Sequence, residues 1–165
     1  MESNNSGDWV KAIGEPAYQA LAELVAAVEC DYDRLDELRD DRDCADNPAQ
    51  WAADNPADSA ELAALESAAG ECADRESAEE RLREDPLSVR IFGERVAGEW
   101  AVDRVEILLT TGGPAVRIMV DVDCEPCRAW LEVQDWGKPW TQYLAGPGSG
   151  ETILAYARVV GPFCD

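Results

Sequence analysis

The chain has 165 residues, of which 35 are acidic and 14 are basic, so its formal net charge is −21. This length suits one domain with its own hydrophobic core, without a need for disulfide or metal support. The negative charge argues against direct binding to nucleic acids or anionic membranes, and the absence of histidine excludes Ser-His-Asp, Cys-His and His-ligated zinc chemistry within the chain.

The negative charge is concentrated in the N-terminal half. Residues 1–86 contain 24 acids and 7 bases, whereas residues 87–165 contain 11 acids and 7 bases. The acidic coat of a halophilic protein would cover the whole surface, so the asymmetry favours a local acidic surface instead. We therefore expect one compact domain in two parts, an acidic helical hairpin over residues 1–86 and a β-rich part over residues 87–165.

Two long helices are predicted in the first part. Residues 1–14 are polar and contain glycine, which predicts a loose start. A first helix should then run from about Ala17 to Cys44, because apolar residues recur there at helical spacing and Pro16 suits a first turn. Residues 45–57 hold two Asn-Pro pairs around Trp51 and predict a loop, with Trp51 at the end of the helical pair.

A second helix is expected to begin at residue 58 or 59 and to end near Glu84, before Pro86. Its N-cap would be Asp58 or Ser59, both of which favour that position. Two helices of this length joined by a moderate loop should pack antiparallel.

After Pro86 the spacing of apolar residues changes from helical to alternating. Alternation over residues 87–91, 105–109, 116–122 and 129–133 predicts strands, and the turn residues of 111–114 and 123–127 connect them. We expect an antiparallel sheet of three or four strands. Residues 151–160 predict a short C-terminal helix capped by Ser149, with an edge strand as the alternative. The predicted fold class is thus α+β.

The most acidic stretch, residues 29–46, contains nine carboxylates and three arginines. Over the predicted hairpin, carboxylates would occur every ~1.7 Å, or every ~2.4 Å once the arginines are subtracted, which is comparable to the charge spacing of duplex DNA at ~1.7 Å. The hairpin would then imitate a nucleic acid toward a basic protein surface. The other interpretation is a solvated pair of helices with weak internal ion pairs. The candidate partner-binding acids are Asp33, Asp36, Glu37, Asp40, Asp41, Glu76, Glu79, Glu80 and Glu84.

Three aromatic residues close in sequence, Trp136, Trp140 and Tyr143, are an alternative candidate surface for a protein partner. In the competing interpretation they close one end of the sheet. If the three aromatic residues do bind a partner, the protein is an interaction or regulatory module, and its acidity serves only solubility.

The six cysteines include a C-x-x-C pair, Cys124 and Cys127, a spacing that can hold zinc or form a disulfide. Structural zinc needs four ligands, and the chain has no second such pair and no histidine. We therefore expect no metal, no cofactor and no catalytic residue. The sequence begins without the pattern of a secretory leader and has no apolar run long enough to span a membrane, so a cytoplasmic protein with reduced thiols is expected.

Two segments carry a resemblance to a known group of proteins. The motifs TTGGPAVRI (residues 110–118) and WLEVQDWGKPWTQY (residues 130–143), followed by ETILAYAR, resemble small acidic proteins of bacterial plasmids, integrative elements and phages. The ending VVGPFCD departs from the more aromatic ending of that group. Proteins of such elements include anti-CRISPR and antirestriction inhibitors. The resemblance implies an inhibitor that binds a basic nucleic-acid-binding protein or ribonucleoprotein of host defence, and it assigns no role to a residue.

Overall fold

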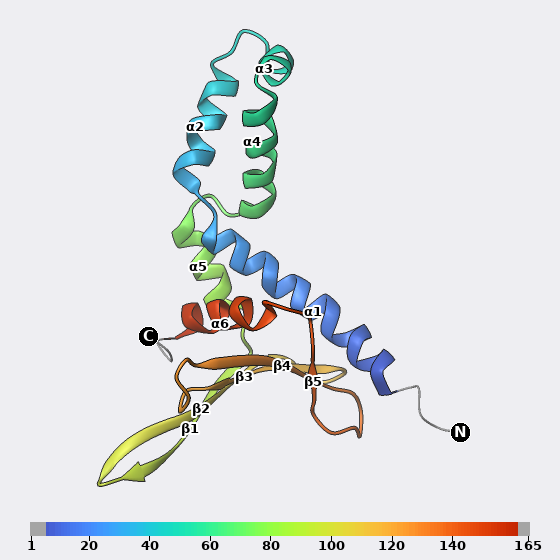
Figure 1. The fold of residues 1–165 in the computed structure, drawn as a ribbon, viewed down its shortest axis with the longest axis vertical. Coiled ribbons are helices and arrows are strands. Elements are labelled where there is room, and N and C mark those ends of the chain that lie inside the picture. The colour runs from blue at the N-terminus through green and yellow to red at the C-terminus, as the bar shows by residue number, and fades with distance from the viewer. Residues whose placement is uncertain (1–5, 162–165) are drawn as a thin grey trace. The chain divides into compact units, whose positions relative to one another are not determined.

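The computed structural model describes residues 6–161, which divide into two compact units. One unit comprises residues 26–80, and the other comprises the described residues of 1–25 together with those of 81–165. Two helices, α1 (Ser6–Glu29) and α5 (Arg75–Glu84), each contribute to both units. The chain has an α+β fold with six helices and one antiparallel sheet in this described part (Figure 1).

The sheet has five strands in sequence order, where three or four were predicted. They are β1 (Ser88–Val96), β2 (Glu99–Thr110), β3 (Ala115–Asp121), β4 (Arg128–Gln134) and β5 (Thr141–Tyr143), each antiparallel to its neighbour. The extra strand is β5, whose three residues are too few to show alternation. β1 and β2 also extend toward each other, to a turn in which both Ala97 and Gly98 have positive φ. Such a turn matches the twist of a hairpin.

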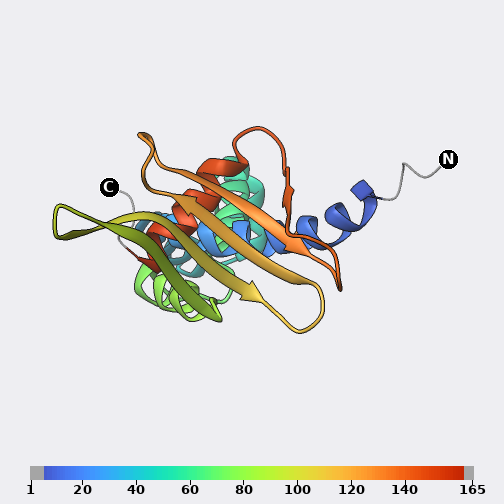
Figure 2. The same ribbon diagram turned by 90° about the horizontal axis from the view of Figure 1, so that it is seen from below.

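One face of the sheet forms the core of its unit. Alternate residues of β2, β3 and β4 point to this face and are almost completely buried: Val105, Ile107, Val116, Ile118, Val120, Leu131 and Val133. The helix α6 (Ser149–Val160) lies on this face over β3 and β4, above the sheet in Figure 1 and behind it in Figure 2. The predicted C-terminal helix is confirmed, but its N-cap is Gly148, and the Ser149 hydroxyl instead donates to the Gly146 carbonyl at 2.8 Å.

The first helix begins earlier than predicted. α1 starts at Ser6 and passes through Pro16, so residues 6–14 are helical, whereas residues 1–5 lie outside the described part. Tertiary contact explains the difference, because Val10 and Gly14 are buried. The ring of Tyr143 in β5 lies where a Cβ on Gly14 would be. This contact stabilises the start of α1, where the local sequence alone gives only a weak prediction of helix.

The unit of residues 26–80 is built on an antiparallel helical pair, α2 (Tyr32–Asp43) and α4 (Pro56–Ala69), joined through α3 (Pro48–Asp54) (Figure 1). Its core comprises Cys30, Leu35, Leu38, Leu62 and Ala69, and Trp51 packs against them. An antiparallel hairpin is therefore present, but it is shorter than expected. The predicted loop of residues 45–57 contains α3, with the Asn47 side chain accepting from the N–H of Ala49 at 3.0 Å.

Each predicted long helix is in fact two helices. The first breaks after Glu29, because the Asp31 side chain accepts from the N–H of Arg34 at 3.1 Å and thus caps a new helix. The second breaks at Gly70, which has a φ of 58°. Asp74 and Ser77 then hydrogen bond reciprocally, backbone N–H to side chain, at 2.8 and 3.2 Å and begin α5. α4 begins at Pro56 with Asn55 as its N-cap, so neither Asp58 nor Ser59 has that role.

Candidate functional surface

Five of the nine candidate acids form a continuous row on α2. Asp33, Asp36, Glu37, Asp40 and Asp41 follow the helical spacing i, i+3, i+4, i+7 and i+8, and all are exposed. Leu35 and Leu38, on the opposite side of the helix, are buried against α4. We call these five residues the acidic stripe.

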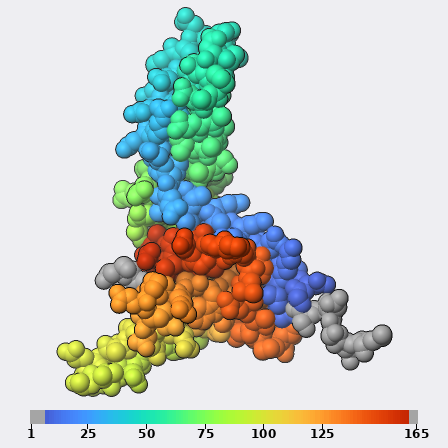
Figure 3. All heavy atoms as spheres, viewed as in Figure 1, coloured from blue at the N-terminus to red at the C-terminus, as the bar shows by residue number. Residues whose placement is uncertain are grey.

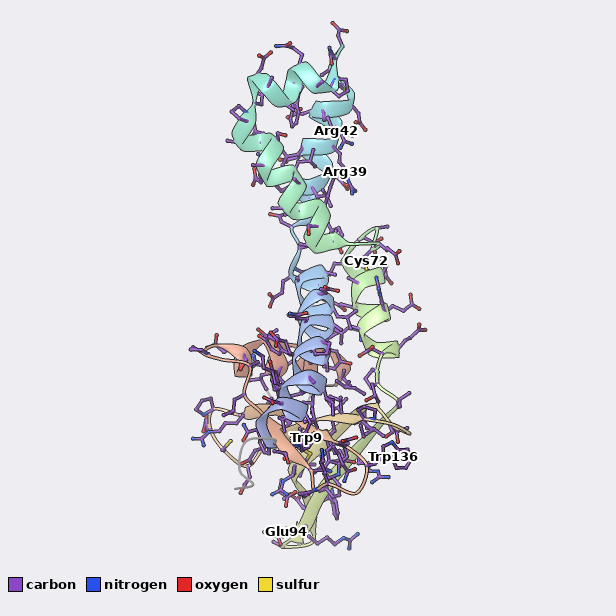
Figure 4. All side chains as sticks on the ribbon, turned by 90° about the vertical axis from the view of Figure 1, so that its right-hand side faces the viewer. Trp9, Arg39, Arg42, Cys72, Glu94 and Trp136 are labelled. Atoms are coloured by element: carbon purple, nitrogen blue, oxygen red, sulfur yellow. The ribbon has the colours of Figure 1, made fainter. Side chains whose placement is uncertain are left out.

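The three arginines of α2 each reach a carboxylate of α4. Arg34 lies 2.9 Å from Glu61 and 3.2 Å from Asp58, measured between guanidinium nitrogen and carboxylate oxygen. Arg42 lies 3.2 Å from Glu66, and Arg39 also reaches this carboxylate at 3.5 Å. Figure 4 shows Arg39 and Arg42 within this helical pair. The carboxylates of α4 therefore take up most of the positive charge of α2.

This arrangement leaves the acidic stripe poorly neutralised. Glu37 lies 3.4 Å from Arg34, and Asp36 lies 3.9 Å from Arg39. However, the side chains of Glu37 and Asp36 are 69% and 71% exposed. Asp33, Asp40 and Asp41 have no ion pair with any described residue. The hydrogen bond from Arg34 to Glu61 raises the pKa of the Arg34 guanidinium, so this arginine remains fully charged and bound to α4.

The spacing of the stripe resembles that of phosphates along one nucleic-acid strand. From Asp33 to Asp41 the helix rises by about 12 Å, which gives one carboxylate per ~3 Å. One strand of duplex DNA has one phosphate per ~3.4 Å of axis. The described residues of 26–80 hold 18 of the 35 acids and 4 of the 14 bases, so the stripe belongs to the more acidic unit.

The other four candidate acids lie on a different helix. Glu76, Glu79, Glu80 and Glu84 follow one side of α5, and three of them are exposed. The breaks at Cys30 and Gly70 divide each predicted long helix, so the nine acids are carried by two separate short helices, α2 and α5. Glu84 belongs to the unit that does not contain the stripe. A partner-binding surface made from all nine acids stays a prediction.

The three candidate aromatic residues are not gathered on one surface. Trp136 is 77% exposed and points outward in Figure 4. The ring of Trp140 stacks under the guanidinium of Arg117, with 4.1 Å between the guanidinium carbon and the ring centroid. Tyr143 pairs with Leu131 on the helix-covered face, where burial raises the pKa of its hydroxyl. Their closeness in sequence did not predict this, because only Tyr143 lies in β5, whereas Trp136 and Trp140 lie in the segment before it.

A charged network on the face of the sheet opposite α6 was not predicted. Arg117 in β3 binds Glu106 in β2 at 2.5 Å and Glu132 in β4 at 2.6 Å, and Trp130 donates to Glu132 at 2.9 Å. These groups are mostly buried, with side-chain exposures of 19%, 11% and 17% for Arg117, Glu106 and Glu132. Each occupies a polar position of an alternating strand, but only the strand register shows that they are neighbours.

The C-x-x-C segment does not form a disulfide between its own two cysteines. Cys127 is disulfide-bonded, whereas Cys124 is a free thiol that donates to the Asp121 carbonyl at 3.3 Å. The expectation that all thiols are reduced is therefore wrong at Cys127. Among residues 6–161, no three acidic or cysteine side chains are grouped so that they could hold a metal ion.

In the same range, every helix is too short or too polar to cross a membrane. Comparison of the chain with protein-family models, with curated proteins and with solved structures found no match.

Proposed function

We propose that this protein is a non-enzymatic inhibitor that places its acidic stripe on a basic, nucleic-acid-binding surface of a partner protein. One observation carries the proposal: five exposed carboxylates follow one side of α2 while the arginines of the same helix bind α4. A basic groove that binds nucleic acid by releasing counterions would accept this row by the same electrostatics.

The identity of the partner is a further part of the proposal and has a different basis. The resemblance of residues 110–118 and 130–143 to proteins of plasmids, integrative elements and phages supports a target in bacterial defence. We propose a CRISPR effector ribonucleoprotein first and a restriction enzyme second. The inhibitor would act in the cytoplasm, where both targets encounter DNA.

The test is displacement of labelled target DNA from a purified CRISPR effector ribonucleoprotein, and then from a restriction enzyme. The test variant neutralises the stripe with nearly isosteric changes: Asp33→Asn, Asp36→Asn, Glu37→Gln, Asp40→Asn and Asp41→Asn. The matched control neutralises five exposed acids elsewhere: Glu23→Gln, Asp54→Asn, Asp103→Asn, Asp123→Asn and Glu125→Gln. Both variants change the net charge equally, so they separate the stripe from overall acidity.

We expect the wild-type protein and the control to displace DNA and the stripe variant to fail, with all three folded by circular dichroism. Full displacement by the stripe variant would refute the mimicry. Equal loss in both variants would show that total charge, and not the stripe, is responsible.

The alternative function, partner binding through aromatic residues, has support at Trp136 only, because this side chain alone of the three is largely exposed. Trp136→Ala tests it in the same assay. If Trp136→Ala abolishes inhibition while the stripe variant retains it, the aromatic residue is the contact.

A further inference from the structure

The β1–β2 hairpin exposes an unusual amount of apolar surface. Seven large apolar side chains in and beside it are between 39% and 59% exposed: Leu87, Val89, Ile91, Phe92, Val96, Trp100 and Val102. Scattered single residues of this kind need no explanation, but a cluster of them on one hairpin indicates an interaction site. Figure 3 shows this hairpin projecting beyond the atoms of α6 and β4.

Part of this surface continues the core-facing side of the sheet. Val89 pairs with Ile107 and Ile91 pairs with Val105, and both β2 partners are fully buried. α6 lies over β3 and β4, so the β1 side chains on the same side are left uncovered by it. The hairpin therefore has one apolar side that the described part of its own unit does not bury.

β1 is also an edge of the sheet. It is nine residues long and pairs with β2 alone among the described residues, whereas the opposite edge, β5, has three residues. At about 3.3 Å per residue, β1 offers ~30 Å of backbone whose outward N–H and C=O groups can accept another strand.

The charge of the hairpin differs from that of the rest of the protein. From Ser88 to Arg104 it holds three arginines and three acids, so it is neutral in a chain of net charge −21. A second copy of this chain would meet strong repulsion at the acidic unit, but no net repulsion at the hairpin. Its surface is therefore suited to a partner with the same balanced charge, and the same hairpin of a second copy has that balance.

We propose that β1 pairs with β1 of a second copy as an antiparallel strand, centred on Phe92. In that register Arg90 of each copy lies opposite Glu94 of the other, which makes two cross-strand ion pairs. A shift of the centre by one residue to Ile91 or Gly93 removes both pairs. The paired strands also bring the exposed apolar residues of two hairpins together, since equivalent side chains then share a face.

Analytical ultracentrifugation of the full chain over a wide concentration range tests the proposal, at a salt concentration high enough to screen the net charge. We expect a monomer–dimer equilibrium. Glu94→Arg should weaken the dimer at least about tenfold, because two attractive pairs become repulsive. Adding Arg90→Glu to that variant should restore it by reversing both partners. Glu94, labelled in Figure 4, lies at the end of the hairpin and is exposed, so its replacement should leave the fold intact.

Glu99→Arg is the matched control, because it makes the same change of charge on β2, away from the edge strand. It should leave the dimer unchanged. A chain that remains monomeric at all concentrations overturns the proposal, as does a dimer that Glu94→Arg and Glu99→Arg weaken equally. A monomer that binds an extended peptide along β1 would also overturn the proposal, because the edge strand would then pair with another partner. None of these outcomes depends on the acidic stripe, which uses other residues.

Discussion

The hydroxyl of Tyr156 in α6 donates a 2.6 Å hydrogen bond to a carboxylate oxygen of Asp85, 71 residues earlier in the chain. The Tyr156 side chain is fully buried, and Asp85 directly follows α5. This bond joins α6 to the segment that leads into β1. Burial raises the pKa of the Tyr156 hydroxyl well above its ordinary value, and the hydrogen bond to Asp85 adds to the shift.

Tyr156→Phe should lower the free energy of unfolding by about 1–2 kcal/mol, because the ring still fills its site while a hydrogen bond to a charged acceptor is lost. Urea denaturation at neutral pH measures this. Tyr143→Phe is the control, since no hydrogen bond from its hydroxyl to a described residue is present, and it should change stability by less than about 0.5 kcal/mol. Equal stability of the wild type and Tyr156→Phe would contradict the expected role of the bond.

The same residue predicts a loss of stability at alkaline pH. A folded-state pKa above the unfolded value means that the stabilisation is complete below pH ~10 and declines as pH rises through the range between the two values. The cause is ionisation of the tyrosine in the unfolded chain before it ionises in the folded one. Unfolding measured from about pH 8 to 11 should show a shallower decline for Tyr156→Phe than for the wild type. Equal declines of stability with pH in the wild type and in Tyr156→Phe would contradict this prediction.

Arg117 should be the most sensitive charged residue of the sheet. Arg117→Met would leave the mostly buried Glu132 without a cation and the mostly buried Glu106 with Arg90 alone, and removal of one member of such a group costs about 3–5 kcal/mol. Arg90 is the matched control, because it also reaches Glu106, at 3.5 Å, but is 68% exposed. Arg90→Met should therefore cost under about 1 kcal/mol. Thermal unfolding of the two variants side by side measures the difference.

Binding of a partner through the acidic stripe should weaken steeply as salt concentration rises. The partner's basic surface would exchange counterions for the carboxylates, as it does for phosphates. Titration calorimetry at several salt concentrations gives the slope of affinity against salt. The stripe variant should show a smaller slope than the wild type. An interface insensitive to salt would instead indicate apolar contacts, such as one through Trp136.

Much of the sheet and the C-terminal helix followed from local patterns. Alternation of apolar residues located β2, β3 and β4, because their side chains meet a core on one side only. The same pattern missed β5, which exists because Tyr143 packs on Gly14 of a distant helix. The two long helices were over-extended for a similar reason: helical spacing continues through Cys30 and Gly70, but the caps at Asp31 and Asp74 begin new helices.

The sequence by itself determined that the chain is strongly acidic and that its excess charge lies in the first half, because composition alone decides both. That five acids share one helical side follows from the bounds of α2, which the structure sets. Only the tertiary structure decided which charges are neutralised, since Arg34, Arg39 and Arg42 find their partners on α4, more than twenty residues away. It also placed Arg117 between two carboxylates, because the strand register sets which residues of neighbouring strands lie side by side, and local spacing does not.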